Sequence, residues 1–224
     1  MKYGDTASSV DNTNRSQVMT RNIFLSLGIL LAIWLAYRGY RISTTRSHSP
    51  TDTINFSHKD LDLEVTYGRP YKKGRVIFGE AKDRAWLPEG KFWTDGFRFL
   101  TGMSRTTGAL VPNGKYWRLG ANDATEVSFS KNINFGGKSV NAGRYRMYAL
   151  PNDDSWQITL NSELGKFGYN EPNYSYDVVS IEVPVETAPS ETEQFTISFE
   201  PDSSEVKMNF VWDKTLVRVP LSIQ

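Results

Sequence analysis

The side chains best suited to recognising a ligand lie in one short segment. Tyr116 and Trp117 offer flat aromatic faces for stacking, and Arg118 offers a rigid fork of N–H donors that matches a carboxylate or a phosphate. Asn122, four residues further on, carries both a donor and an acceptor. The segment could therefore bind a small molecule, with Arg118 and Asn122 as polar anchors and an aromatic ring as the stacking surface.

A structural interpretation of the same residues competes with the ligand site, and we favour the structural one. Trp117 would belong to the hydrophobic core, Arg118 would pair with a buried carboxylate such as Asp177, and Asn122 would satisfy backbone groups in a turn. In that case Arg118→Ala should lower the melting temperature markedly, because removing one partner of a buried ion pair costs about 3–5 kcal/mol.

A second candidate is a cluster of four basic residues around Pro70 and Gly74: Arg69, Lys72, Lys73 and Arg75. The cluster could bind an anion, and Arg69 and Arg75 are therefore kept as possible ligand-binding residues. More often a run of this kind is a solvated turn. Arg144 and Arg146 share one face of a predicted strand and would extend the basic patch if the fold brought them close.

Catalysis has fewer candidates, because the residue types that it needs are scarce. A glycosidase-like hydrolase requires two carboxylates at a defined separation, and the sequence offers Asp123, Glu126 and Asp177 without a spacing that fixes a pair. The chain has no cysteine, and its two histidines, His48 and His58, precede the predicted domain. These absences argue against a thiolate or histidine metal site and a Ser-His-Asp triad. We therefore assign no catalytic residue, no metal and no cofactor.

Several short motifs follow one another in an order that chance would rarely produce: Arg69–Gly79, Trp117–Thr125, Ala142–Tyr145 and a late Trp212. Over roughly residues 60–224 they resemble a bacterial family known as domain of unknown function 2911 (DUF 2911). The resemblance implies an exported protein but no particular reaction. Two features depart from the family: Asn113 stands where an aromatic residue is usual, and residues 80–108 look like an insertion.

The insertion contains an Asp95-Gly96 pair between aromatic residues. Asp-Gly suits the tight turn of a β-hairpin, since both central residues need positive φ angles. We therefore expect a hairpin that carries four large rings, which would form a small core of their own or a surface for a partner: Phe92, Trp93, Phe97 and Phe99.

From residue 60 onward, apolar side chains alternate with polar ones. Examples are the runs that begin at Val179, Phe195, Val206 and Val217. Alternation of this kind is typical of strands with one buried face, and turn signals separate the runs. We predict an all-β fold, an antiparallel, jelly-roll-like β-sandwich of eight to ten strands, preceded by one N-terminal transmembrane helix.

The predicted domain organisation has four parts. Residues 1–21 form a disordered tail, residues 22–40 a transmembrane anchor and residues 41–59 a flexible linker. Residues 60–224 form the β-sandwich, with the inserted hairpin at 80–108.

The anchor is predicted from an uncharged run, residues 22–37, that Arg21 and Arg38 bound. A cleaved signal peptide is the competing interpretation, but no small-x-small cleavage motif follows the run. The charges on the two sides nearly balance, so orientation rests on the family resemblance, which implies export. We expect a single-pass protein of the bacterial cytoplasmic membrane with its domain on the periplasmic side. The net charge of +1 gives no reason to expect a nucleic-acid partner.

Two classes of function remain. The first is a membrane-anchored binding module of the cell envelope, with a small molecule, a sugar or a protein as its ligand. The alternative is a carboxylate-dependent, glycosidase-like hydrolase, which is ranked lower because the commonest nucleophile–base systems are missing.

Overall fold

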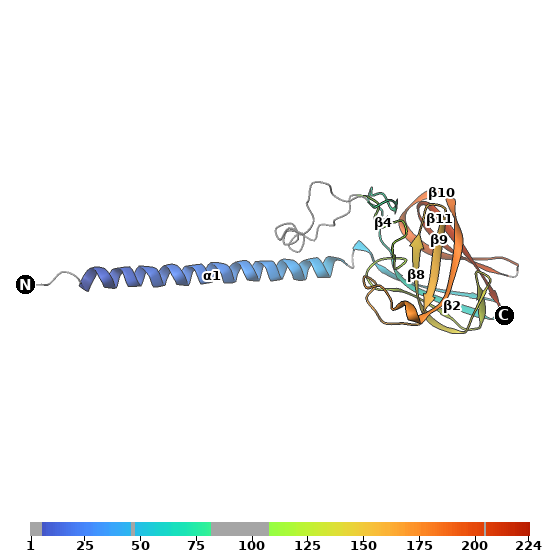
Figure 1. Ribbon diagram of the computed structural model, residues 1–224, viewed down its shortest axis with the longest axis horizontal. Helices are drawn as coiled ribbons and strands as arrows, with labels where there is room; N and C mark the ends of the chain where they lie inside the picture. The colour runs from blue at the N-terminus through green and yellow to red at the C-terminus, as the bar shows by residue number, and fades with distance from the viewer. Residues whose placement is uncertain (1–5, 46–47, 82–107, 204) are drawn as a thin grey trace, which may run out of the picture. The chain divides into compact units, whose positions relative to one another are not determined.

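The computed structural model describes residues 6–45, 48–81, 108–203 and 205–224 (Figure 1). The chain divides into two compact units, Met1–Ser47 and His48–Gln224. The predicted hairpin at Asp95-Gly96 lies outside the described residues.

The first unit is a single helix, α1 (Thr6–Thr45). Within it, Gln17–Tyr40 is long and apolar enough to cross a membrane, a property that a signal sequence near an N-terminus would share. The helix begins inside the segment that the sequence predicted to be disordered. Residues 6–21 contain no glycine or proline that would stop a helix from extending backwards from the apolar run.

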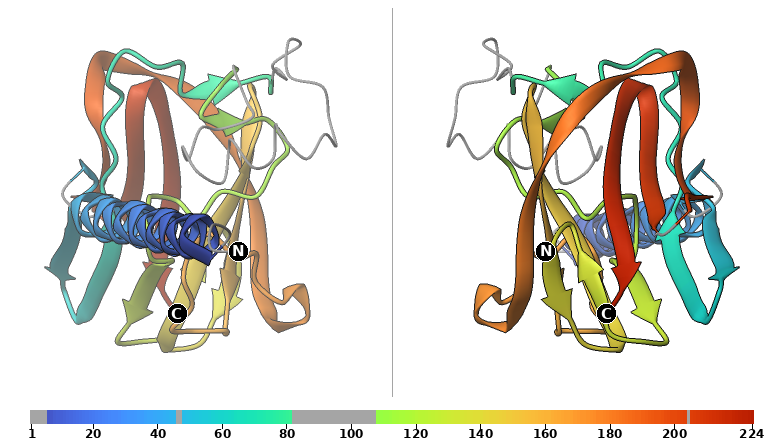
Figure 2. Two further views of the ribbon diagram at one scale, coloured as in Figure 1. Left: turned by 90° about the vertical axis from the view of Figure 1, so that its left-hand side faces the viewer. Right: turned by 90° about the vertical axis from the view of Figure 1, so that its right-hand side faces the viewer.

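The second unit is built mainly from antiparallel strands, whose layers Figure 2 shows from two sides. In the described part of the chain they are β1 (Thr51–His58), β2 (Leu61–Gly68), β3 (Phe78–Gly79), β4 (Val111–Pro112), β5 (Thr125–Phe129), β6 (Ile133–Phe135), β7 (Lys138–Val140), β8 (Gly143–Pro151), β9 (Ser155–Asn161), β10 (Asp177–Pro201) and β11 (Val206–Ile223). Nine of them form one sheet in the order β1-β2-β5-β8-β9-β10-β11-β6-β7, and β3 pairs with β4 in parallel.

The two layers of the fold are continuous through β10. Its first part, Asp177–Pro184, pairs with β9, and its later part pairs with β11. Register shifts between Thr187 and Thr196 bend the strand where it leaves one layer for the other. The predicted antiparallel β-sandwich with an N-terminal apolar helix is confirmed.

Large aromatic side chains fill the space between the layers. The rings of Trp117 and Trp212 stack with their centroids 6.1 Å apart, and Trp156 meets Trp117 edge-on at 5.4 Å. Phe195 lies 5.0 Å from Trp117. Trp117 is only 7% exposed, so it belongs to the core, as the structural interpretation predicted.

Strand β1 corrects the predicted flexible linker. It pairs with β2 along its whole length, and the rings of Phe56 and Phe199 stack at 5.1 Å. Ile54 and Phe56 alternate with polar residues, but two apolar residues within a Ser- and Thr-rich stretch gave too weak a signal for a strand. The compact unit therefore begins at His48 rather than at residue 60.

We expect a fragment spanning residues 48–224 to fold as an all-β domain and to be more stable than a fragment spanning 60–224. The shorter fragment lacks β1 and should lose about 2 kcal/mol or more, because burying an Ile or Phe side chain contributes about 1.5–3 kcal/mol. Circular dichroism and urea unfolding measure both properties, with a fragment that starts at Thr51 as the control that keeps β1. Equal unfolding free energies for the fragments starting at 48 and 60 would contradict the role given to β1.

Candidate functional site

A pocket of about 390 Å³ lies beside the aromatic core. Nine residues line it: Leu110, Val111, Pro112, Tyr116, Trp117, Arg118, Gly168, Tyr169 and Glu171. They come from β4 and the residue before it, from the segment that follows β4 and from the loop between β9 and β10. Three residues singled out from the sequence, Tyr116, Trp117 and Arg118, therefore lie in one wall of a pocket.

Backbone pairing explains how these three side chains are placed. Trp117 exchanges two hydrogen bonds with Ala149 of β8, at 2.9 and 2.8 Å. Trp117 is thereby held like a strand residue with its ring in the core, and its neighbours Tyr116 and Arg118 point the other way. The Arg118 stem packs against Gly168, where a Cβ atom would lie 2.6 Å from the Arg118 Cδ.

The turn after Arg118 needs an unusual backbone. Leu119 and Asn122 have φ angles of 51° and 63°, and Gly120 has a φ of 154°. The Thr125 hydroxyl donates to the Leu119 carbonyl at 2.7 Å and holds the turn closed. Gly68 lies directly against it, and the Gly68 carbonyl accepts a hydrogen bond from the Ala121 N–H at 3.2 Å.

Asn122 ties this turn to the start of the domain. Its side chain, 9% exposed, donates to the Ser49 carbonyl at 3.0 Å. Its own carbonyl accepts hydrogen bonds from Gly168 N at 3.1 Å and from Arg118 Nη1 at 3.4 Å. Asn122 does not line the pocket; it positions residues that do.

Arg118 is half-buried, and its environment differs from the expected one. Burial lowers the pKa of its guanidinium, while Tyr116 and Tyr169 act in the opposite direction. The expected pairing with Asp177 is wrong, because Asp177 accepts its hydrogen bonds from Tyr148, at 2.9 Å, and from Asn161, at 2.7 Å. Among the described residues, no carboxylate lies within ion-pair distance of Arg118. Within the described part of the chain, the hydrogen-bond partner of the guanidinium is the Asn122 carbonyl.

A second arginine, Arg146 on β8, lies behind Tyr116 and is 1% exposed. Its Nη2 donates to the Tyr116 hydroxyl and to the Asn170 carbonyl, both at 2.5 Å. Its Nη1 lies 3.9 Å from a carboxylate oxygen of Glu163. Arg146 thus clamps the β9–β10 loop onto the pocket wall, a role that the sequence did not reveal.

Arg69 and Arg75 are not brought to this pocket. Arg69 forms an ion pair with Asp52 at 3.1 Å and donates to the Thr196 hydroxyl and the Phe195 carbonyl. Arg75 donates to backbone carbonyls of its own turn. Both guanidinium groups bind parts of the fold around them.

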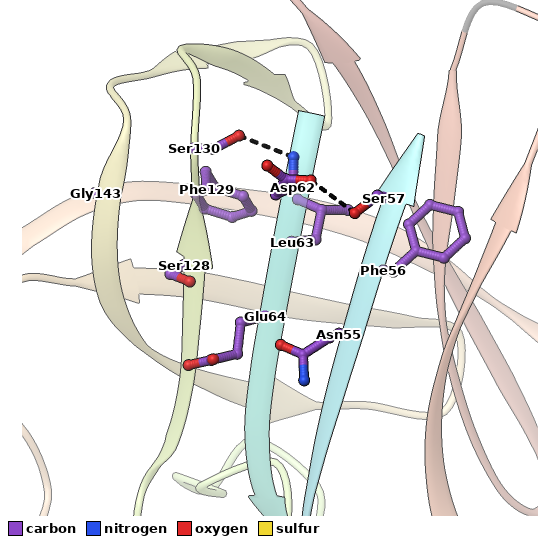
Figure 3. Close-up of a pocket in the computed structure, with 10 residues that line it drawn as sticks. All are labelled: Asn55, Phe56, Ser57, Asp62, Leu63, Glu64, Ser128, Phe129, Ser130 and Gly143. Carbon is purple, nitrogen blue, oxygen red and sulfur yellow. Dashed lines mark hydrogen bonds between the residues drawn. The ribbon is translucent and has the colours of Figure 1, made fainter. Parts of the chain in front are cut away.

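A wider hollow, of about 560 Å³, lies over β1, β2 and β5 (Figure 3). Asp62 and Glu64 from β2 line it, two residues apart on one strand. Asp62 accepts a hydrogen bond from Ser57 at 2.6 Å, and Arg144 approaches Glu64 to 3.7 Å. The Glu64 side chain is 40% exposed, so water reaches it freely.

None of the three carboxylates considered for hydrolysis, Asp123, Glu126 and Asp177, lines either of the two pockets described above. Glu126 binds Arg144 at 2.8 Å, and Asp177 is held by Tyr148 and Asn161. The pocket beside Arg118 contains another carboxylate, Glu171, which accepts a hydrogen bond from the Tyr174 hydroxyl at 2.5 Å. Within the described ranges, no group of three or more His, Asp or Glu side chains could hold a metal ion.

Tyr148, a buried tyrosine near this site, should make the stability of the fold depend on pH in the alkaline range. Tyr148 is 2% exposed; burial, and then its hydrogen bond to Asp177, raise the pKa of its phenol well above the usual value. The folded state therefore holds this proton more tightly than the unfolded chain does. The resulting stability is fully present below about pH 10 and is lost as the pH rises further. We expect Tyr148→Phe to make the unfolding free energy fall less steeply above pH 10.

Urea unfolding at several alkaline pH values measures that slope, and Tyr176→Phe, at a residue that is 53% exposed, is the matched control. A slope that is the same in Tyr148→Phe and in the unsubstituted protein would contradict the prediction.

The fold and the pocket define a class: an antiparallel β-sandwich with an N-terminal apolar helix and a small, partly cationic pocket. The chain belongs to the family DUF2911, described as a protein of unknown function, whose family model matches residues 101–221, more than half of the chain. No curated protein and no solved structure matches it.

Proposed function

We propose that the protein is a membrane-anchored binding module that takes up a small organic anion in the pocket beside Arg118. The observation that carries the proposal is the partial burial of the Arg118 guanidinium without an ion-pair partner among the described residues. Its charge is partly desolvated; the Asp123 carboxylate offsets this only weakly, and in the described ranges no carboxylate forms an ion pair with it. A buried charge without a partner costs free energy, and an anionic ligand would remove that cost.

The other pocket residues narrow the ligand class. Glu171 offers carboxylate oxygens to a hydroxyl or ammonium group, and the exposed ring of Tyr169 offers a face for stacking. A ligand with an acidic group at one end and hydroxyl or amino groups at the other fits both. Acidic sugars and small hydroxy or amino acids have this chemistry.

We also propose where the domain is located in the cell. Gln17–Tyr40 would serve as an uncleaved anchor in the bacterial cytoplasmic membrane, with the sandwich on the periplasmic side as a module of the cell envelope. Cell fractionation with N-terminal sequencing tests this part. A soluble mature protein that begins near residue 40 would show a cleaved signal sequence instead.

Binding is tested by thermal shift on the full chain in detergent, against uronic acids, sugar phosphates, hydroxy acids and amino acids. A true ligand raises the melting temperature through mass action. We expect at least one acid to stabilise the protein and the same acid to have no effect on Arg118→Gln. Arg144→Gln, at an exposed arginine outside the pocket, should respond like the unsubstituted protein. Stabilisation of Arg118→Gln by every active compound would contradict the assignment.

The hydrolase remains the second candidate, with a different pair of residues. Asp62 and Glu64 lie two positions apart on β2, about 7 Å between Cα atoms, and line one hollow (Figure 3). Glycoside hydrolysis needs two carboxyl groups about 5–10 Å apart, and side chains two positions apart on a strand point to the same face, where carboxyl groups can reach such a separation. We rank this function lower because both carboxylates are exposed to solvent, whereas a general acid needs a site that keeps it protonated. Hydrolysis of chromogenic glycosides that Glu64→Gln abolishes would favour it.

A further inference from the structure

One loop of the sandwich exposes an unusual number of aromatic rings. We call residues 163–176, between β9 and the start of β10, the aromatic loop. Four of its rings are about half or more exposed: Phe167 at 53%, Tyr169 at 75%, Tyr174 at 48% and Tyr176 at 53%. Leu164 adds a further exposed apolar side chain at 40%. Single exposed apolar residues are ordinary, whereas several on one loop are typical of a surface that contacts a partner or a membrane.

The first half of this loop lies where the chain enters the sandwich. Phe167 pairs with Asp123 in an isolated antiparallel β-bridge, and the Gly168 N–H donates to the Asn122 carbonyl at 3.1 Å. The Asn122 side chain in turn binds the Ser49 carbonyl at 3.0 Å. Two hydrogen bonds through one residue therefore connect the aromatic loop to the second residue of the domain.

The entry point cannot lie far from the end of the apolar helix. Seven residues, 41–47, separate Tyr40, the last residue of the candidate span, from His48. Even a fully extended chain covers at most about 3.6 Å per residue, so the nine steps from Tyr40 to Ser49 reach no more than about 32 Å. If the span crosses a bilayer, Ser49 and the loop tied to it lie within that distance of the membrane surface.

From this placement we infer that the aromatic loop docks on the bilayer in which the same chain is anchored, with Phe167 and Tyr169 in the headgroup region. Tyrosine suits that position, because its ring is apolar and its hydroxyl stays hydrated. Charge contributes little, since Lys166 lies 3.7 Å from Glu163. Docking should therefore occur on zwitterionic lipid and change little with salt. The inference rests on the anchoring part of the proposed function; it shares Tyr169 with the pocket but does not depend on a ligand being bound there.

The chain has no cysteine, so a single introduced cysteine can be labelled without background. We would reconstitute full-length Lys166→Cys, labelled with an environment-sensitive nitrobenzoxadiazole dye, into phosphatidylcholine vesicles that contain a spin-labelled lipid quencher. Lys166 is exposed and lies beside Phe167. The matched control is Asp60→Cys in the β1–β2 turn. Asp60 is also exposed. It lies at the far end of the β1–β2 pair, about 25 Å along the strands from the end where Thr51 pairs with Gly68.

We expect a blue-shifted emission that the lipid quencher reduces at least twofold more at position 166 than at position 60. Replacing Phe167 and Tyr169 by Ser should remove that difference, while circular dichroism confirms that the variant is folded. Equal quenching at the two positions would overturn the inference. Flotation of the same vesicles at alkaline pH tests the anchor separately: protein that leaves them overturns the anchoring and the docking together, whereas protein that floats with equal quenching overturns the docking alone.

Discussion

Gly68→Ala is expected to destabilise the sandwich by about 3 kcal/mol or more, at the upper end of what overpacking costs. A Cβ atom at this position would lie 2.0 Å from the Ala121 carbonyl oxygen and 2.8 Å from its carbon. The clash is with backbone, so no side-chain rotation can relieve it. The Gly68 carbonyl also accepts the Ala121 N–H, and the substitution therefore pushes apart two segments that bind each other.

Urea unfolding measures this effect, and Gly74→Ala is the matched control. A Cβ atom at Gly74 would meet nothing within 4 Å, although its φ of 68° leaves a backbone strain of about 1–2 kcal/mol. Because the Ala121 turn follows Arg118 directly, Gly68→Ala should also weaken binding of any acid found in the screen. A loss of stability no larger than that of Gly74→Ala would show that the contact relaxes freely.

Arg146→Ala is expected to cost about 3–5 kcal/mol, the range for breaking a buried charged contact from one side. The substitution leaves the Asn170 carbonyl without the arginine donor and removes the support of the Tyr116 ring, over which the guanidinium lies at 5.6 Å. Arg144→Ala should cost about 1 kcal/mol or less, since its ion pair with Glu126 involves an arginine that is 47% exposed.

The two arginines form a matched pair, two residues apart on the same strand. Thermal unfolding of both variants should separate them by many degrees. Similar melting temperatures would contradict the central position that the structure gives to Arg146.

The difference in burial between Arg144 and Arg146 could not be predicted from the sequence. Both follow the alternation of β8, so the sequence predicts that they share one face and could extend one basic patch. Their difference arises from the β9–β10 loop, which crosses back over the sheet and covers Arg146 alone. Nothing in the local pattern of β8 encodes a contact with residues 24 positions further along the chain.

The same limit explains the outcome for the candidate site. Alternating apolar residues predicted the sandwich, and the aromatic content of the motif placed Trp117 in the core. The partner of Arg118 was predicted wrongly, because a plausible carboxylate in sequence, Asp177, is held by Tyr148 and Asn161. Side-chain pairing across strands depends on register and loop paths, which periodicity does not determine.

Whether Arg118 binds the acidic group of a ligand can be measured as a difference between two affinities. Isothermal titration would compare the best acid from the screen with its uncharged analogue, such as a uronic acid with the parent sugar, on the unsubstituted protein and on Arg118→Gln. We predict that the unsubstituted protein prefers the acid at least about tenfold, as a hydrogen bond to a charged group contributes about 1.5–3 kcal/mol. In Arg118→Gln that preference should disappear, while affinity for the uncharged analogue stays unchanged. A preference for the acid that persists in Arg118→Gln would contradict the account.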